Sequence, residues 1–549
     1  MMPNRWLALL ALCFLLTTAE ARGLGPLPAR SAEPVDPTPA TTGLPEPAAL
    51  PGPPAMLAPR FEVSVVEGLI DAPTDGRLVV ILARRARPEP RNAISLPVPG
   101  SPVVLGVDAE LVAPGTVTVV DASARSFPVS ALGRLNPGEY VAQAVLMRNP
   151  DLLLLNAPGN LSSAPTPVRL DPADTDPITL ELTRIDPPER LPDDTDLVRY
   201  LKVPSKLLSE FHGRPMFLRV AVVLPRDYGK DPSVRYPLRV HIGGFGSRFT
   251  AARRRMAEGS PFRRIWLADD TPRFVMLFLD GAGPLGDPYQ VNSANHGPYG
   301  DAITQELIPY VERLYRGIGE GYARVLDGGS TGGWVSVALQ VFYPDFFNGC
   351  WASCPDSLDF RSFQLINIYD DANAYTTADG AERPAFRRED GTPVYSMRDE
   401  CSLENALGLG GSWSMSGGQW GSWNATYGPR GPDGRPVPLW DPVTGAIDQS
   451  VLDHWAKYDI RRVLESDWQT LGPKLRGKLH IWMGDADNFF LERALRRLEA
   501  FLETADPPFE GSIVYGAGEG HCWSGITEQE MMQQMAEAVA SGAPERSDN

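Results

Sequence analysis

The sequence is poor in residues that bind metals, carry positive charge or span membranes. Its 549 residues include 6 histidines and 5 cysteines, and 51 Lys and Arg against 68 Asp and Glu give a formal net charge of -17. Nucleic acids and anionic membranes repel a surface of that charge, so neither class of partner is expected. No apolar run beyond the N-terminal segment is long enough to span a bilayer.

The cysteines are too few and too poorly spaced for a zinc site. Cys350 and Cys354 form one close pair, but neither a second pair nor a His-x-x-x-His motif accompanies them. The four cysteines other than Cys13 allow up to two disulfides, whose pairing the sequence does not fix: Cys350, Cys354, Cys401 and Cys522. No metal and no organic cofactor is expected.

The N-terminal segment is typical of an exported protein. Arg5 precedes an apolar run over 6–16, and Ala19-Glu20-Ala21 has the small-x-small form of a signal-peptidase site. We expect a signal peptide over 1–21 and a secreted or periplasmic protein. Residues 22–59 are rich in Pro and Ala and predict a disordered linker, as 541–549 predict a disordered tail.

The rest of the chain exceeds one ordinary core and predicts two folded domains. Over 60–186, short β-rich runs at 61–66, 78–82, 116–120 and 140–146 are separated by Pro, Gly and Asp, which indicates a small all-β sandwich. It could bind glycan or pack against the next domain, and packing is favoured because no aromatic cluster stands out.

Residues 197–540 alternate strands and helices, which is typical of an α/β fold with a mostly parallel sheet. Expected strands are 217–224, 238–242, 274–279, 349–353, 478–483 and 512–515; expected helices are 302–315, 489–502 and 528–539. Residues 355–472 interrupt the alternation as an insertion. Its tryptophans could stack on sugar or phenolic groups or form the insertion's own core: Trp413, Trp420, Trp423, Trp440, Trp455 and Trp468.

A serine lies on a glycine-rich turn between an expected strand and an expected helix. Residues 323–327 form the strand, Gly328-Gly329-Ser330-Thr331-Gly332 has the G-x-S-x-G pattern, and apolar residues then recur at helical spacing. Gly328 and Gly332 allow the strained turn and the close passage of helix and strand. We therefore predict that Ser330 is a nucleophile rather than an incidental turn serine.

A serine hydroxyl needs a base and an acid that orients the base. His521 follows the last expected strand on a glycine-rich loop, where a base is expected when the chain order is Ser, acid, His. Asp487 and Asp485 both follow the preceding strand. Asp487 is the preferred orienting acid and Asp485 the alternative, although either could instead cap the next helix.

An oxyanion formed at Ser330 would need fixed hydrogen-bond donors. The backbone N–H of Thr331, directly after the serine, is the first candidate. The second is the backbone N–H of Phe245, in the loop Gly243-Gly244-Phe245-Gly246-Ser247 that follows the expected strand 238–242. An ordinary tight glycine turn is the alternative interpretation of that loop.

Several motifs in fixed order resemble the esterase D-like family of the α/β-hydrolase superfamily. They are Gly244-Phe245-Gly246, Asn295-His296-Gly297-Pro298 followed by residues 306–312, the turn at Ser330, Asp487-Asn488-Phe489, and the late His521. The resemblance covers about residues 197–539. The family includes feruloyl and acetylxylan esterases, enterochelin esterases, S-formylglutathione hydrolases and mycolyltransferases.

This resemblance implies an α/β-hydrolase fold and a Ser330, Asp487, His521 triad that cleaves carboxylic esters of small molecules or glycans. An acyltransferase or peptidase would use the same triad, and a glycan-binding or surface protein could retain the scaffold without activity. The long insertion departs from the minimal fold. We expect Cys522, beside the base, to tether the loop of His521 through a disulfide. Neither the exact ester nor the oligomeric state follows from the sequence.

Overall fold

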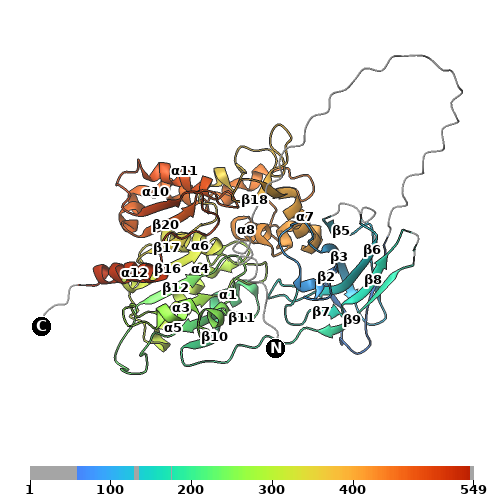
Figure 1. Cartoon of the computed structure of the whole chain (residues 1–549), viewed down its shortest axis with the longest axis horizontal. Coiled ribbons are helices and arrows are strands. Elements are labelled where there is room, and N and C mark those ends of the chain that lie inside the picture. Colours follow the sequence, from blue (N-terminus) through green and yellow to red (C-terminus); the bar gives the residue numbers. More distant parts are fainter. Residues whose placement is uncertain (1–58, 129–134, 173, 175, 545–549) are drawn as a thin grey trace, which may run out of the picture.

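The computed structural model describes residues 59–128, 135–172, 174 and 176–544. In these residues an all-β N-terminal unit lies beside a larger unit in which helices flank a central sheet (Figure 1). The expected signal peptide 1–21, the linker apart from its last residue, and residues 545–549 of the expected tail lie outside the described residues. None of the helices in the described ranges is long and apolar enough to cross a bilayer.

The central sheet has eight strands in the order β10-β11-β13-β12-β16-β17-β20-β21. Strand β11 is antiparallel to both neighbours, and the other neighbouring strands run parallel. Strand β13 lies between β11 and β12, out of chain order, and this order beside an antiparallel strand is the α/β-hydrolase topology. The predicted fold is confirmed. The strands are β10 (Val198–Ser205), β11 (Met216–Val223), β12 (Leu238–Ile242), β13 (Val275–Leu279), β16 (Arg324–Gly329), β17 (Cys350–Ser353), β20 (Leu479–Gly484) and β21 (Ser512–Gly516).

The inner strands are apolar along their whole length because both faces of the sheet are covered. On β11, Val220 and Val222 join one apolar core, whereas Ala221 and Val223 join a second core with Met532 of the last helix. The flanking helices are α1 (Lys206–His212), α2 (Ala251–Arg255), α3 (Pro261–Trp266), α4 (Tyr299–Asp301), α5 (Ile308–Leu314), α6 (Thr331–Phe342), α10 (Ile460–Leu475), α11 (Glu492–Leu502) and α12 (Glu528–Gly542).

Two expected helices differ in detail. Residues 302–315 are helical, but the first part is a π-type segment, Ala302–Leu307, before α5 begins. The helix expected from residue 489 begins at Glu492, because Asp487 Oδ1 accepts the N–H groups of Phe489 and Leu491 and holds a turn there. This turn keeps Asp487 at the carboxyl edge of the sheet.

The N-terminal unit forms a nine-stranded network, in which Leu78, Val80 and Leu82 of β2 face the unit's own core. Val79 and Ile81, on the other face of β2, pack against the insertion. Both faces of β2 are therefore buried, as expected for a packing role. The strands are β1 (Phe61–Val65), β2 (Thr74–Ala83), β3 (Val103–Val112), β4 (Val117–Val120), β5 (Arg125–Phe127), β6 (Gly138–Met147), β7 (Leu161–Ser163), β8 (Thr166–Leu170) and β9 (Ile178–Ile185).

The insertion has its own aromatic core, built around α7 (Met397–Leu407) and α8 (Gln419–Tyr427) beside a hairpin of β18 (Pro384–Arg387) and β19 (Pro393–Ser396). All six of its tryptophans are buried, and Trp413 stacks on Trp440 with ring centroids 4.4 Å apart. The indoles therefore form the interior of the insertion and do not present a stacking platform at its surface.

A buried carboxylate fixes the start of α8. Glu404, on α7, accepts the N–H groups of Trp420 and Gly421 at 3.0 and 2.9 Å and the hydroxyl of Ser416 at 2.6 Å. A negative group at a helix N-terminus accepts from the free N–H groups and interacts favourably with the positive end of the helix dipole. Gln419 Nε2, in the first turn of α8, lies 3.4 Å from Thr331 Oγ1 and 3.5 Å from Asp356 Oδ2.

Candidate active site

Ser330 occupies a strained turn between β16 and α6. Its φ and ψ are 58° and -125°, a backbone conformation that residues other than glycine rarely adopt. A β-carbon on Gly332 would clash with the carbonyl oxygen of Ile242, and one on Gly328 would lie 2.6 Å from that oxygen. Only glycine fits at both positions, because α6 passes directly over the end of β12. The turn has the geometry of a nucleophile elbow.

His521 bridges this serine and a buried carboxylate. Its Nε2 lies 3.1 Å from Ser330 Oγ, and its Nδ1 lies 2.6 Å from Asp487 Oδ2. Because Asp487 accepts, Nδ1–H donates to it and Nε2 is left to accept the serine hydroxyl. Burial lowers the pKa of His521, but the Asp487 carboxylate outweighs this, and the pKa lies above its usual value. The structure thus brings together the three predicted side chains.

The two aspartates after β20 have separate roles. Asp485 Oδ1 accepts the N–H of Gly518 at 2.6 Å, in the loop that leads to His521. Asp487 contacts the imidazole through Oδ2 while Oδ1 holds the turn before α11. Asp487, the preferred candidate, therefore contacts the imidazole and also bonds to the turn before α11, whereas the N-cap residue of that helix is Leu491.

The loop that carries Phe245 lies against the elbow. The carbonyl oxygens of Ile242 and Gly243 face Gly332, and Gly246 N–H donates to Asp287 Oδ2 at 3.1 Å. Burial raises the pKa of Asp287 to about 7. Thr331 begins α6, so its N–H belongs to the free first turn of the helix. Thr331 and the start of the loop that carries Phe245 thus both lie next to the elbow.

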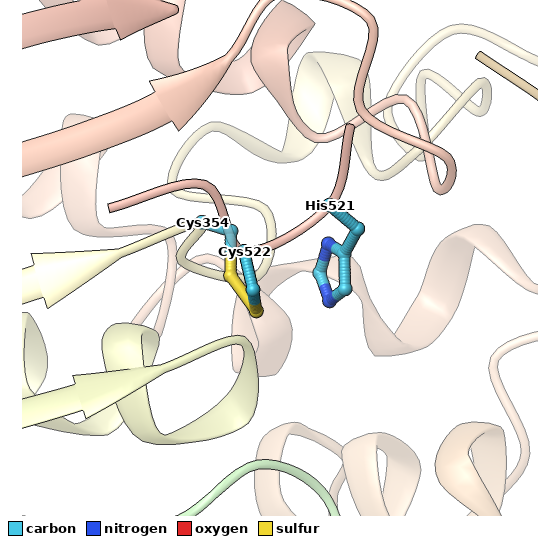
Figure 2. Close-up of side chains that lie close together, drawn as sticks. All are labelled: Cys354, His521 and Cys522. Carbon is cyan, nitrogen blue, oxygen red and sulfur yellow. A yellow bond between two sulfur atoms is a disulfide. The ribbon is translucent and has the colours of Figure 1, made fainter. Parts of the chain in front are cut away.

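A disulfide joins Cys354, after β17, to Cys522, directly after His521 (Figure 2). Ser330 N–H also donates to Cys354 Sγ at 3.1 Å. The disulfide therefore contacts Ser330 at one end and is adjacent in sequence to His521 at the other. The four candidate cysteines thus form one disulfide, and Cys350 and Cys401 are free and buried. The sulfurs and His521 form a cluster of possible metal ligands, but the sulfurs are bonded to each other and neither offers a thiolate.

None of the other five histidines has a hydrogen bond to Ser330 or Asp487 in the described residues. His241 Nδ1 contacts Asp327 at 2.8 Å, and His480 Nδ1 contacts Ser512 at 3.0 Å. His212 Nε2 contacts the carbonyl oxygen of His296 at 3.0 Å. Position after the last strand therefore predicted the histidine that lies beside Ser330 in the structure.

The sequence did not reveal a second buried carboxylate beside Ser330. Asp356, in the loop after β17, places Oδ1 3.5 Å from Ser330 Oγ. Its Oδ2 accepts from Tyr289, from Thr331 and from Trp423 of the insertion. No motif marks it, because these partners are far apart in the sequence and meet only in the folded chain.

The sheet order and the turn at Ser330 define the α/β-hydrolase fold. No protein-family model and no curated protein matches the chain. Similar solved structures include a ferulic acid esterase at 13% identity, covering 62% of this chain and 95% of that one, with a TM-score of 0.36. A fluorophosphonate-binding serine hydrolase of Staphylococcus aureus has 15% identity, coverage of 62% and 98%, and a TM-score of 0.34. An S-formylglutathione hydrolase of Agrobacterium tumefaciens has 11% identity, coverage of 64% and 98%, and a TM-score of 0.35.

Proposed function

We propose that the protein is an exported serine hydrolase that cleaves carboxylic esters. The observation that carries this proposal is the single imidazole, with its two nitrogens 3.1 Å from Ser330 Oγ and 2.6 Å from Asp487 Oδ2. That arrangement lets one group take the serine proton while a fixed carboxylate holds its ring. A strained elbow that presents the serine supports the same role.

In the proposed reaction His521 Nε2 takes the proton of Ser330 as Oγ attacks the ester carbonyl carbon. The carbonyl oxygen becomes an oxyanion that accepts hydrogen bonds from the N–H groups of Thr331 and Phe245. The C–O bond to the alcohol then breaks, and the imidazolium gives its proton to the departing oxygen. Water, deprotonated by His521, attacks the acyl-enzyme and releases the carboxylic acid and free Ser330.

Export is the second part of the proposal. Residues 1–21 have the pattern of a signal peptide, and a disulfide such as Cys354–Cys522 persists in oxidising compartments. Substrates would then be extracellular or periplasmic small-molecule or glycan-linked esters, including phenolic esters. An acyltransferase or peptidase would use the same three side chains, with a different acceptor or leaving group.

A fluorophosphonate probe tests the nucleophile. The wild type should be labelled and Ser330→Ala should not, while both remain folded by circular dichroism. Labelling of Ser330→Ala, or none of the wild type, would contradict the proposal. A panel of p-nitrophenyl acyl esters, feruloyl sugars, acetylated xylan and p-nitroanilides, with and without an added alcohol acceptor, then separates esterase, peptidase and acyltransferase.

A non-catalytic glycan-binding protein is the competing proposal. Its sequence support was the set of tryptophans in the insertion and the extra all-β unit. The indoles are buried and do not form an exposed binding surface. Glycan binding without labelling would favour it.

A further inference from the structure

A buried carboxylate lies next to the proposed nucleophile and has no part in the mechanism above. Asp356 is 3% exposed, and its Oδ1 is 3.5 Å from Ser330 Oγ. His521 Nε2 is 3.1 Å from the same oxygen atom. The serine hydroxyl therefore lies between an imidazole and a second carboxylate.

The position of this carboxylate is fixed from several elements. Oδ2 accepts from Tyr289 at 2.7 Å, from Thr331 Oγ1 at 3.1 Å and from Trp423 Nε1 at 3.2 Å. The N–H of Asp356 donates to the carbonyl oxygen of Ser330 at 3.3 Å. Gln419 Nε2 also lies 3.5 Å from Oδ2, so four donors surround that oxygen and Oδ1 is the oxygen that faces Ser330. Burial raises the pKa of Asp356 above its usual value, and these donors, together with the charge of His521, act against that rise.

We propose that Asp356 is a positioning residue that, together with Asp487, stabilises the positive charge on His521 and disfavours esters whose acyl group carries a negative charge. The inference rests on the proposed function. His521 becomes an imidazolium as Ser330 attacks, and two carboxylates then flank one cation in a site shielded from water. A substrate anion bound at Ser330 would instead meet the buried charge of Asp356.

The ionisable groups around His521 and Asp356 determine how the pKa of His521 responds when the charge of Asp356 is removed. Asp487 and Asp356 both raise the pKa of His521. Asp356 in turn faces Tyr289 and Tyr427, and both stay neutral because burial raises their pKa values. It also faces Asp287, whose pKa burial raises to about 7. Removing the charge of Asp356 lowers the pKa of His521 and also that of Asp287. Activity that needs either group deprotonated should then persist to lower pH.

The test compares the wild-type mature chain with Asp356→Asn, which keeps the size of the side chain. The pH dependence of kcat/KM for p-nitrophenyl butyrate should show a lower midpoint in the variant, by up to about one pH unit, and a maximum reduced about tenfold or more. The ratio of kcat/KM for p-nitrophenyl butyrate to that for mono-p-nitrophenyl succinate, which is anionic, should fall about tenfold. Glu537→Gln removes an exposed carboxylate of α12 and should change neither the midpoint nor the ratio.

A midpoint and a substrate ratio equal to those of the wild type, at any level of activity, would overturn the role of Asp356. If Asp356→Asn does not fold, Tyr289→Phe removes the donor at 2.7 Å and disfavours the charged carboxylate, so the substrate ratio should again fall. An unchanged ratio in that variant would also contradict the proposal. Failure of a fluorophosphonate to label the wild type would overturn the proposed function itself, which distinguishes the two failures.

Discussion

The carboxylate of Asp487 lies 2.6 Å from Nδ1 of His521 and is fully buried. Asp487→Asn removes the charge that orients the ring and favours its protonated form. We expect kcat/KM for p-nitrophenyl esters to fall by about 10³ to 10⁴ with little change in fold. Asp485→Asn serves as the comparison, because Asp485 bonds to Gly518 N–H and not to the imidazole. A larger loss in Asp485→Asn than in Asp487→Asn would reverse the assignment.

The elbow should not tolerate even one added methyl group. Gly332→Ala places a β-carbon against the carbonyl oxygen of Ile242, so α6 must move away from β12. We expect loss of activity and destabilisation of about 2 kcal/mol or more, measured by urea denaturation. Gly229→Ala is the matched control, since no heavy atom lies within 4 Å of its added carbon. Equal stability of the two variants would show that the close packing at Gly332 is unimportant.

Glu404 should make stability depend on pH. Burial raises its pKa from 4.5 to about 7, so the folded state resists ionisation that the unfolded state undergoes freely. The cost is absent below pH 4.5 and grows as pH rises from 4.5 to 7. Relative to Glu404→Gln, the wild type should therefore lose on the order of 2 to 3 kcal/mol over that window. Denaturant titrations of both proteins at pH 4.5, 6 and 8 measure this, and a constant difference would contradict it.

The disulfide should hold the loop of His521 in place. Cys354→Ser with Cys522→Ser should lower the free energy of unfolding by about 2 to 4 kcal/mol and reduce esterase activity. Dithiothreitol should reduce the activity of the wild type but leave that of the double variant unchanged, because Cys350 and Cys401 are unpaired. Sensitivity of the double variant to the reductant would mean that another bond is responsible.

The all-β unit should stabilise the insertion. Arg77 is buried between them, donates to the carbonyl oxygens of Asn405 and Ala406 at the end of α7, and pairs with Asp108 at 2.8 Å. Arg77→Met leaves these acceptors without a donor, and we expect a loss of about 2 to 3 kcal/mol in stability. Arg85→Met changes an exposed arginine and should have little effect. Equal midpoints of thermal unfolding for the two variants would contradict this role.

Local patterns were enough to predict the elbow and the histidine that lies beside it. Ser330 is marked by glycines that a strand-to-helix turn requires, and His521 by its place after the last strand. Seven of the eight strands of the central sheet were expected from the sequence; the edge strand β10, whose buried residues alternate with more exposed ones, was not. Other features depend on contacts between distant segments. Nothing near Asp356 indicates that Trp423 and Tyr289 will bond to it. The pairing of Cys354 with Cys522 was likewise one of several possibilities.

The identity of the nucleophile tests the account most directly. The protein is mixed with p-nitrophenyl acetate, quenched in acid within the first turnover, digested, and mapped by mass spectrometry. We predict a burst of p-nitrophenol and an acetyl group on the peptide that contains Ser330, with neither in His521→Ala. Acetylation at another residue, or an equal burst from Ser330→Ala, would contradict the proposed chemistry.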